Sequence, residues 1–260
     1  MLQLSELAIL LPPLLAGLLI LTLHVPLGYS VLKRKIVFLD LAVAQMASLG
    51  AVIGPLVFYS QAESGWLVQI IATITALAGA VLLGFFSRAR VVVQEAVIGI
   101  SFVLSASMAL LLLSHDPHGA ESIEHVLSGQ LLWVNNQQLQ TMAVVYGLLM
   151  LGGLLLPARW NGWLFYPFFA IVITQSVQVA GVYLVFASLI IPSLIGSLFE
   201  RYRYFVSYSL GIAGYLLGLL FSYILDLPAG PTIVVLLTLL AGLVALIKTL
   251  QRRVLLGSKV

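Results

Sequence analysis

A carboxylate and an amide stand in an otherwise small and apolar segment, FLDLAVAQMASLGAVIG, at residues 38–54. Ionisable groups inside a membrane segment are costly and mark functional sites by default. At about 1.5 Å of rise per residue, Asp40 lies about 7 Å past Lys35, and Gln45 lies about 15 Å past it. His24, in the preceding apolar segment, falls at a depth comparable to that of Gln45. We expect these three side chains to line a hydrated path. Interhelical hydrogen bonds, or pairing of Asp40 with the nearby basic residues, are the alternatives.

The second concentration of polar residues is the stretch SHDPHGAESIEH, which separates two apolar segments. Its imidazoles and carboxylates belong to His115, Asp116, His118, Glu121, Glu124 and His125. Imidazole and carboxylate ligands suit zinc or manganese, and clustered acids raise the local concentration of cations. Their spacing matches no rigid metal site, so the sequence leaves two interpretations open, a metal-attracting outer loop and a solvated polar loop.

Composition excludes several classes of protein. Of the 260 residues, 62% are hydrophobic and 8% are charged, with a mean hydropathy of +1.14, whereas soluble domains carry roughly 25% charged residues. Such a chain needs lipid as its solvent, and no polar stretch is long enough for a soluble domain, so residues 1–260 are predicted to form one transmembrane domain. The basic residues fall in short, separated clusters, which does not indicate nucleic-acid binding. The N-terminus lacks the features of a cleaved signal peptide, so the first apolar segment is interpreted as a span.

No catalytic motif is apparent. The segment GLVALIKT, residues 242–249, resembles a phosphate-binding loop only superficially, because Ile247 occupies the place of the required second glycine. The lack of cysteine excludes disulfides and thiolate metal ligands. We therefore expect a chain that is not an enzyme and holds no resident cofactor, so any ATP hydrolysis would belong to another subunit.

The charges predict how the chain crosses the membrane. Basic loops stay cytoplasmic, and most acids fall in the loops between the basic ones, which predicts an outer N-terminus, a cytoplasmic C-terminus and eight or nine spans. Between Arg159 and Arg201 the chain must cross an even number of times, either as two short helices, about 163–176 and 177–198, or as a broken or re-entrant element. The other spans are expected at about 5–31, 36–60, 66–86, 95–114, 138–158, 204–225 and 229–248.

Glycines recur at four-residue spacing in two of the predicted spans, as Gly50 and Gly54 and as Gly214 and Gly218. Such pairs let helix backbones approach each other closely in lipid. We expect both pairs to lie at contacts between helices.

Four blocks, in order along nearly the whole chain, resemble a known family. They are LGYSVLKRKIVFLDLAVAQMASLGAVIG, QEAVIGISFVLSASMALLLLS, VAGVYLVFASLIIPSLIGSLF and DLPAGPTIVVLL. These blocks are similar to those of the membrane permeases of bacterial metal ABC transporters, which import zinc, manganese or iron. The resemblance implies a fold like that of the vitamin B12-type importers and a homodimer of permeases in the bacterial inner membrane. It also implies a cytoplasmic ABC ATPase, present twice, and an extracytoplasmic metal-binding protein that delivers the cargo.

The chain departs from the family pattern in its polar helix. Many members carry Asp, then His four residues later, then Gly five residues beyond. With Gly50 aligned, the His position falls on Gln45 and the Asp position falls on Leu41, one residue after Asp40. The segment before the third block is also shortened, to ARWNGWL. The chain therefore resembles a divergent branch of the family, in which an amide replaces a better zinc ligand. The resemblance implies that His24, Asp40 and Gln45 line the metal path at the seam of the dimer.

The sequence thus predicts an all-α polytopic permease subunit of an ABC importer for a divalent metal, zinc ahead of manganese or iron. A secondary transporter and a siderophore- or vitamin-type ABC permease are the alternatives. For coupling to the ATPase, we expect Pro192 to break the helix. The segment from Ser193 to Glu200, which includes Gly196, is then expected to form a short docking helix.

Overall fold

The computed structural model describes residues 10–57, 65–86, 91–113, 124, 127–155 and 163–257. The described elements are helices, and no strand occurs among them. In chain order they are α2 (Leu11–Arg34), α3 (Leu39–Val57), α4 (Gly65–Phe85), α5 (Val91–Leu113), η3 (Leu131–Trp133), α7 (Asn136–Leu155), α8 (Phe165–Ser197), η5 (Glu200–Tyr202), α9 (Arg203–Leu225) and α10 (Ala229–Gly257). The prediction of an all-α fold is confirmed.

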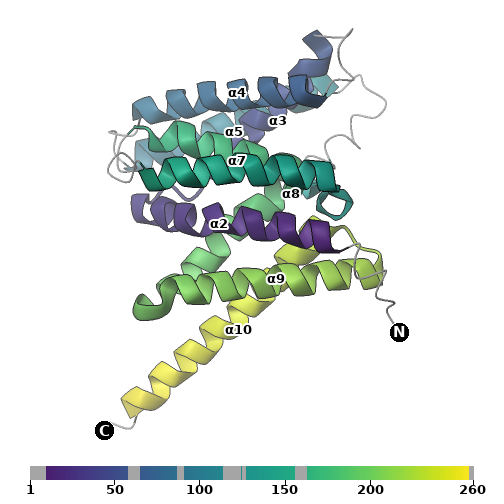
Figure 1. Cartoon of the computed structure of the whole chain (residues 1–260). Coiled ribbons are helices and arrows are strands. Elements are labelled where there is room, and N and C mark those ends of the chain that lie inside the picture. The colour runs from purple at the N-terminus through teal and green to yellow at the C-terminus, as the bar shows by residue number, and fades with distance from the viewer. Residues whose placement is uncertain are drawn as a thin grey trace.

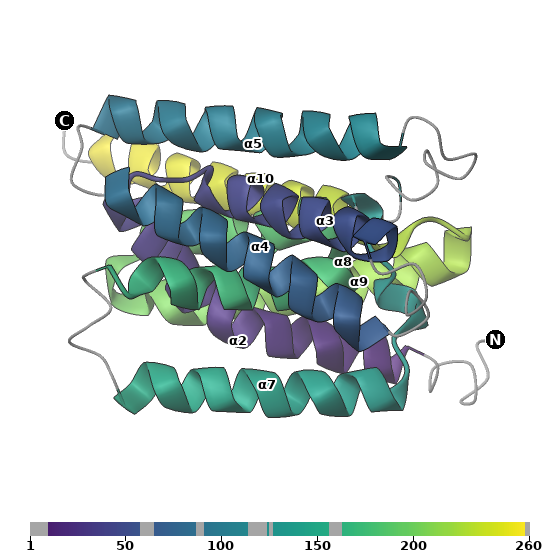
Figure 2. The same ribbon diagram turned by 90° about the horizontal axis from the view of Figure 1, so that it is seen from above.

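The helices form a bundle of roughly parallel rods, which α10 crosses obliquely (Figure 1). In the view of Figure 2, α5 and α7 lie on opposite sides of the bundle, with the other helices between them. Six of the described helices are long and apolar enough to cross a membrane, and α3 is a shorter apolar helix. Helices of this length and composition agree with the predicted multi-pass membrane protein.

The uncertain region of the sequence, residues 163–198, is a helix that turns back on itself at Gly181. This glycine has φ 75° and ψ 163°, a conformation that is essentially confined to glycine. Ser176 and Ser188 both contact the imidazole of His24, whereas a straight helix would separate these two positions by about 18 Å. The helix α8 therefore consists of a first arm, residues 165–180, and a second arm, residues 182–197.

Both ends of α8 lie beside the C-terminal end of α2. The guanidinium of Arg34 is 4.2 Å from the centre of the Phe165 ring, and Gly196 packs against Tyr29. The predicted return of the chain to the same side is confirmed. The predicted boundary near residue 176 is wrong, because the helix breaks where a glycine can adopt positive φ, at Gly181.

Backbone contacts hold the turn of α8 against two other segments. The N–H of Gln130 donates to the Val179 carbonyl at 3.0 Å. A Cβ on Gly129 or Gly181 would collide with the backbone around the other glycine, and a Cβ on Gly230 would collide with the segment before η3. The turn of α8, the chain before η3 and the start of α10 thus meet in close backbone contact, which requires glycine.

Both predicted glycine pairs lie at helix contacts. Gly50 and Gly54 of α3 face α4, and Gly214 and Gly218 of α9 face α10. A Cβ would lie 2.9 Å from an α4 Cα at Gly50 and 2.6 Å from an α10 Cα at Gly218. At Gly50 and Gly218 a side chain larger than hydrogen would push the helices apart, whereas at Gly54 and Gly214 it would first meet side-chain atoms. The pairs thus permit the close packing of α3 on α4 and of α9 on α10.

Basic and acidic side chains gather at opposite ends of the bundle. At one end, the guanidinium of Arg203 lies 5.4 Å from the Tyr29 ring, and Lys248 of α10 lies 4.5 Å from an aromatic ring just before η5. At the other end, Glu124 and Asp226 line one cavity of about 520 Å³. This separation agrees with the charge pattern behind the predicted topology, whose orientation in the membrane stays a prediction.

Candidate functional site

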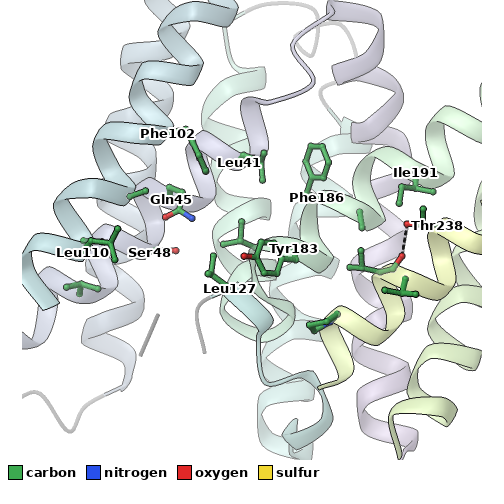
Figure 3. Close-up of a pocket in the computed structure, with 18 of the residues that line it drawn as sticks. Leu41, Gln45, Ser48, Phe102, Leu110, Leu127, Tyr183, Phe186, Ile191 and Thr238 are labelled. Carbon is green, nitrogen blue, oxygen red and sulfur yellow. Dashed lines mark hydrogen bonds between the residues drawn. The ribbon is translucent and has the colours of Figure 1, made fainter. Parts of the chain in front are cut away.

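A cavity of about 790 Å³ lies between α3, α5, the second arm of α8 and α10 (Figure 3). Its wall from α3 is made by Leu41, Gln45, Ser48 and Val52. These residues recur every three or four positions and therefore form one face of the helix. The polar segment that the sequence singles out thus contributes one of its faces to the cavity.

Gln45 is the amide on this wall. It is 7% exposed, and it lies beside Ser48 across the cavity from Thr238 of α10 (Figure 3). No hydrogen bond joins its amide to another residue in the described part of the chain. Amide and hydroxyl oxygens coordinate a cation weakly and hydrogen-bond readily to an organic molecule. The described lining contains neither a carboxylate nor an imidazole.

Asp40 lies off this cavity. Five positions separate it from Gln45, which is about 140° around an α-helix, so Leu41 takes the cavity-facing place. The Asp40 side chain is 1% exposed, and neither carboxyl oxygen has a hydrogen-bond partner among the described residues. It stands in the first turn of α3, where the helix dipole favours negative charge. The structure therefore does not bring Asp40 and Gln45 into one ligand set.

His24 is fully buried and also lies off the cavity. Its Nδ1 is 2.7 Å from the Ser188 hydroxyl and its Nε2 is 2.9 Å from the Ser176 hydroxyl. The Tyr146 hydroxyl of α7 bonds to Ser176 in turn. Both ring nitrogens are thus engaged by α8. The structure brings His24 to the arms of that helix and not to Gln45.

The predicted outer loop lies mostly outside the described part of the chain. Five of its six candidate residues lie outside the described residues: His115, Asp116, His118, Glu121 and His125. Glu124 is exposed and lines the cavity that it shares with Asp226. Within the described part of the chain, no group of three His, Asp or Glu side chains could hold a metal ion. The metal-attracting role of the loop stays a prediction.

The expected break at Pro192 is wrong, because α8 continues through it to Ser197. Proline costs the helix one hydrogen bond, whereas unwinding in an apolar environment would leave several backbone groups unpaired. Ser193 and Gly196 are buried, and Ser193 donates to a carbonyl of α2 at 3.0 Å. Among the four residues proposed for docking, Glu200 alone is exposed.

Other side chains at this end are open to a partner. Leu194 is 49% exposed, Leu198 is 46% exposed and Tyr202 is 59% exposed. Sequence reasoning missed them, and it also missed the cavity walls from α5 and α10. Apolar residues on a membrane helix look alike whether they face lipid, a cavity or a subunit. The spacing of Phe102, Ala106 and Ala109 on α5 was the available signal for that wall.

Two comparisons of sequence place the chain among membrane transport proteins. The sequence pattern of the ABC 3 transport family matches residues 6–159 and 152–249. A relative from Thermotoga maritima, described as a "Probable metal transport system membrane protein", is 28% identical over 193 residues, 64% of this chain and 67% of the relative. An uncharacterized membrane protein from Cyanophora paradoxa, in the ycf23-apcF intergenic region, is 25% identical over 177 residues, 59% of each chain.

Two solved structures share the fold. PsaBC from Streptococcus pneumoniae, in complex with Fab, has a TM-score of 0.70 at 17% identity, over 91% of this chain and 90% of that one. A transporter assigned to the metal-chelate ABC type, in an inward-facing conformation, has a TM-score of 0.68 at 17% identity, over 90% of this chain and 85% of that one. The predicted likeness to an ABC permease fold is confirmed.

Proposed function

The chain belongs to the ABC 3 transport family, and we propose that it is the membrane-spanning permease subunit of an ATP-driven importer for a divalent metal ion. Metal transport is the activity named for the T. maritima relative. Membership of an ABC family favours ATP-driven transport over an ion-driven secondary transporter. Zinc is the first candidate cargo, ahead of manganese and iron, on the strength of the family resemblance in the sequence.

The observation that carries this proposal is the cavity between α3, α5, α8 and α10. Two of its walls come from α5 and α10, which are little covered by the rest of the chain. In each of these helices, 17% of an apolar stretch of 18 residues is buried. In the proposed homodimer, a second copy covers these faces. The two cavities then meet at the seam between the copies and form the path for the cargo.

Along this path, Gln45 is proposed to be a weak oxygen ligand near the middle of α3. Asp40 is proposed to attract the cation further toward the cytoplasm, once a movement of α3 has uncovered its buried carboxyl group. Weak ligands suit a permease because it must release its cargo. His24, expected to add an imidazole, is engaged by two serines in this structure.

The partners follow from the two ends of the bundle. The basic end is proposed to face the cytoplasm, where the ATPase contacts exposed residues around the end of α8, including Leu198. The opposite end, with Glu124 and Asp226, is proposed to receive metal from an extracytoplasmic binding protein. This orientation puts the N-terminus outside and the C-terminus in the cytoplasm of a bacterial cell.

A permease for a metal held in an organic chelate is the second candidate. The lining favours it because most of the described lining residues are apolar. The polar ones are Gln45, Ser48, Tyr183 and Thr238. An apolar wall suits the organic shell of a chelate better than it suits a hydrated ion. The cavity of about 790 Å³ also falls within the range of roughly 300–1,000 Å³ that is typical of sites for small molecules.

Uptake by the purified complex in liposomes tests both candidates. The permease is reconstituted with its ATPase and binding protein, and accumulation of radioactive zinc is measured with ATP, without ATP and with a hydrolysis-deficient ATPase. ATP-dependent accumulation of the free ion supports the proposal. Accumulation of zinc only when it is presented in an organic chelate supports the second candidate. Uptake that follows an ion gradient and ignores ATP contradicts both.

A further inference from the structure

One imidazole connects the two arms of α8. His24, Ser176 and Ser188 are each 0% exposed, and both ring nitrogens lie within ordinary hydrogen-bond distance of a serine hydroxyl. Ser176 belongs to the first arm and Ser188 to the second, on opposite sides of the turn at Gly181. His24, from α2, therefore bridges two segments that the chain itself connects only at the turn.

The hydrogen bonds of this bridge can be counted. The Ser176 hydroxyl also lies 2.8 Å from the Val172 carbonyl, and the Ser188 hydroxyl lies 3.1 Å from the Val185 carbonyl. An imidazole in its neutral form carries one N–H, so it donates to one serine and accepts from the other. The serine that donates to the ring loses its hydrogen bond to the backbone carbonyl of its own helix. Either serine can take this part, and Tyr146 can donate to Ser176 in both cases, so the bridge has two arrangements with equal numbers of hydrogen bonds.

The second arm of α8 is a wall between this bridge and the cavity. Ser188 contacts His24, while its neighbour Ala187 lines the cavity. Close packing ties the same arm to α2, since a Cβ on Gly28 would collide with the Leu189 carbonyl, and Ser193 donates to an α2 carbonyl at 3.0 Å. A displacement of this arm at Ser188 therefore moves the cavity wall.

We propose that His24 is a positioning residue for transport. By bridging Ser176 and Ser188, it sets the separation of the two arms of α8 and thereby the place of the cavity wall that the second arm forms. This role rests on the proposed function of the chain as a permease. It requires no contact between the imidazole and the cargo, so it differs from the ligand role that the sequence suggests for His24.

The chain offers variants that test the bridge with a matched control. His24→Leu removes the bridging ring, and Ser176→Ala and Ser188→Ala each remove one of its ends. Thr174→Val is the control, because Thr174 is a buried hydroxyl residue of the same arm that donates only within its own helix, to the Ala170 carbonyl at 2.8 Å. All variants are examined in the purified complex.

Arm separation is measured by pulsed electron paramagnetic resonance between two spin labels, since the chain has no native cysteine. The labels are attached at Leu164→Cys, before the first arm, and at Leu194→Cys, in the second arm, which are 44% and 49% exposed. We expect His24→Leu and both serine variants to shift or broaden the distance distribution. Thr174→Val should leave it unchanged.

Zinc uptake by the same variants supplies the second measurement. We expect the maximal rate to fall about tenfold in His24→Leu and about threefold in each serine variant, with the half-saturating zinc concentration changed less than about twofold. Combining His24→Leu with Ser188→Ala should cause no further loss, because both changes remove the same interaction, whereas Ser176→Ala also removes the hydrogen bond to Tyr146. Thr174→Val should transport at the wild-type rate.

An unchanged distance distribution in His24→Leu would overturn the positioning role. It is also overturned if His24 variants change the metal preference while both serine variants behave as wild type, because the ring is then a ligand of the cargo. If His24→Leu does not fold, His24→Asn replaces it, since its amide retains the Ser188 contact and should give an intermediate separation. Lack of ATP-driven uptake by the wild-type complex contradicts the proposed function instead, and the distance measurements still decide whether the bridge holds the arms.

Discussion

The helix α8 and the helices α5 and α10 are built from the same apolar residue types, yet the chain covers them very differently. In α8, 72% of an apolar stretch of 18 residues is buried, and hydrogen bonds to α2 and α7 hold its arms in place. In α5 and in α10, 17% of the corresponding stretch is buried. At its N-terminal end, α5 is tied to α8 by a hydrogen bond from Gln94 to the Tyr166 hydroxyl, at 2.7 Å.

The difference teaches where polar groups act in a membrane bundle. Lipid gives helices little hydrophobic reason to associate, so close packing and hydrogen bonds decide which helices stay together. In this chain the buried imidazole belongs to the well-packed part, whereas the cavity and the exposed helices carry few polar groups. A buried histidine in such a protein therefore marks a joint between helices as readily as it marks a ligand.

The largest expected effect on stability is a difference between glycine substitutions in α8 and in α5. Gly181→Val places a β-branched side chain at φ 75° and against the backbone around Gly129, so we expect a loss of about 3 kcal/mol or more in the free energy of unfolding. Gly99→Ala, on α5, meets no atom within 4 Å and should change stability by less than about 0.5 kcal/mol. Thermal unfolding in detergent checks both, and equal shifts in Tm would remove the contrast between the regions.

The next effect concerns the end of the second arm. Gly196→Arg is a poor probe of docking because even a Cβ there would collide with Tyr29 and Ser207. Leu198 is 46% exposed, so we expect Leu198→Glu to leave Tm unchanged and to reduce ATP-driven uptake by about tenfold, the loss of roughly 1.4 kcal/mol of coupling. ATP hydrolysis and uptake are measured together in liposomes. Wild-type uptake in Leu198→Glu would exclude this surface from the contact with the ATPase.

A smaller effect is expected from the buried carboxyl group of α3. Asp40→Asn keeps the size of the side chain and removes a potential charge that has no hydrogen-bond partner among the described residues. We therefore expect no loss of stability, because burial of an unpaired charge is unfavourable. A role in the cation path predicts that uptake falls several-fold. Unchanged uptake with raised stability would show that Asp40 serves neither the path nor the packing.

The smallest effect on the fold is expected at the cavity face of the same helix. Gln45→His and Gln45→Leu should each change the free energy of unfolding by less than about 0.5 kcal/mol, because the amide bonds to no described neighbour. Competition between zinc and manganese during uptake is the measurement that matters. We expect Gln45→His to shift preference toward zinc, since imidazole is the better ligand. Identical preferences in all three proteins would place the selective step elsewhere.

Several features of the fold were accessible from the sequence for identifiable reasons. The low content of charge predicts a membrane protein, and the glycine pairs of α3 and α9 predict close helix contacts, because both depend on composition and local spacing. The helical period also explains the cavity face of α3, where Leu41 and Gln45 share one side and Asp40 does not. These inferences need no knowledge of which helices are neighbours.

Other expectations failed because they depend on neighbours far away in the sequence. Pro192 stays inside a helix since unwinding it in an apolar environment would cost more than the hydrogen bond that it lacks. His24 reaches two serines more than 150 positions away, and no local pattern distinguishes that bridge from a ligand position. The turn at Gly181 depends on the close backbone contacts around Gly129 and Gly230 as much as on the conformation of Gly181 itself.

By itself, the sequence determined that this chain is an all-α membrane permease, which ends of its helices carry charge, and which residues are polar within the apolar spans. Only the tertiary structure decided what those polar residues do: Gln45 faces a cavity, Asp40 is enclosed with no hydrogen-bond partner among the described residues, and His24 joins the arms of α8. The reason is physical. Composition and period act within a single helix, whereas a polar group in an apolar interior takes its role from the partner that the packing brings to it.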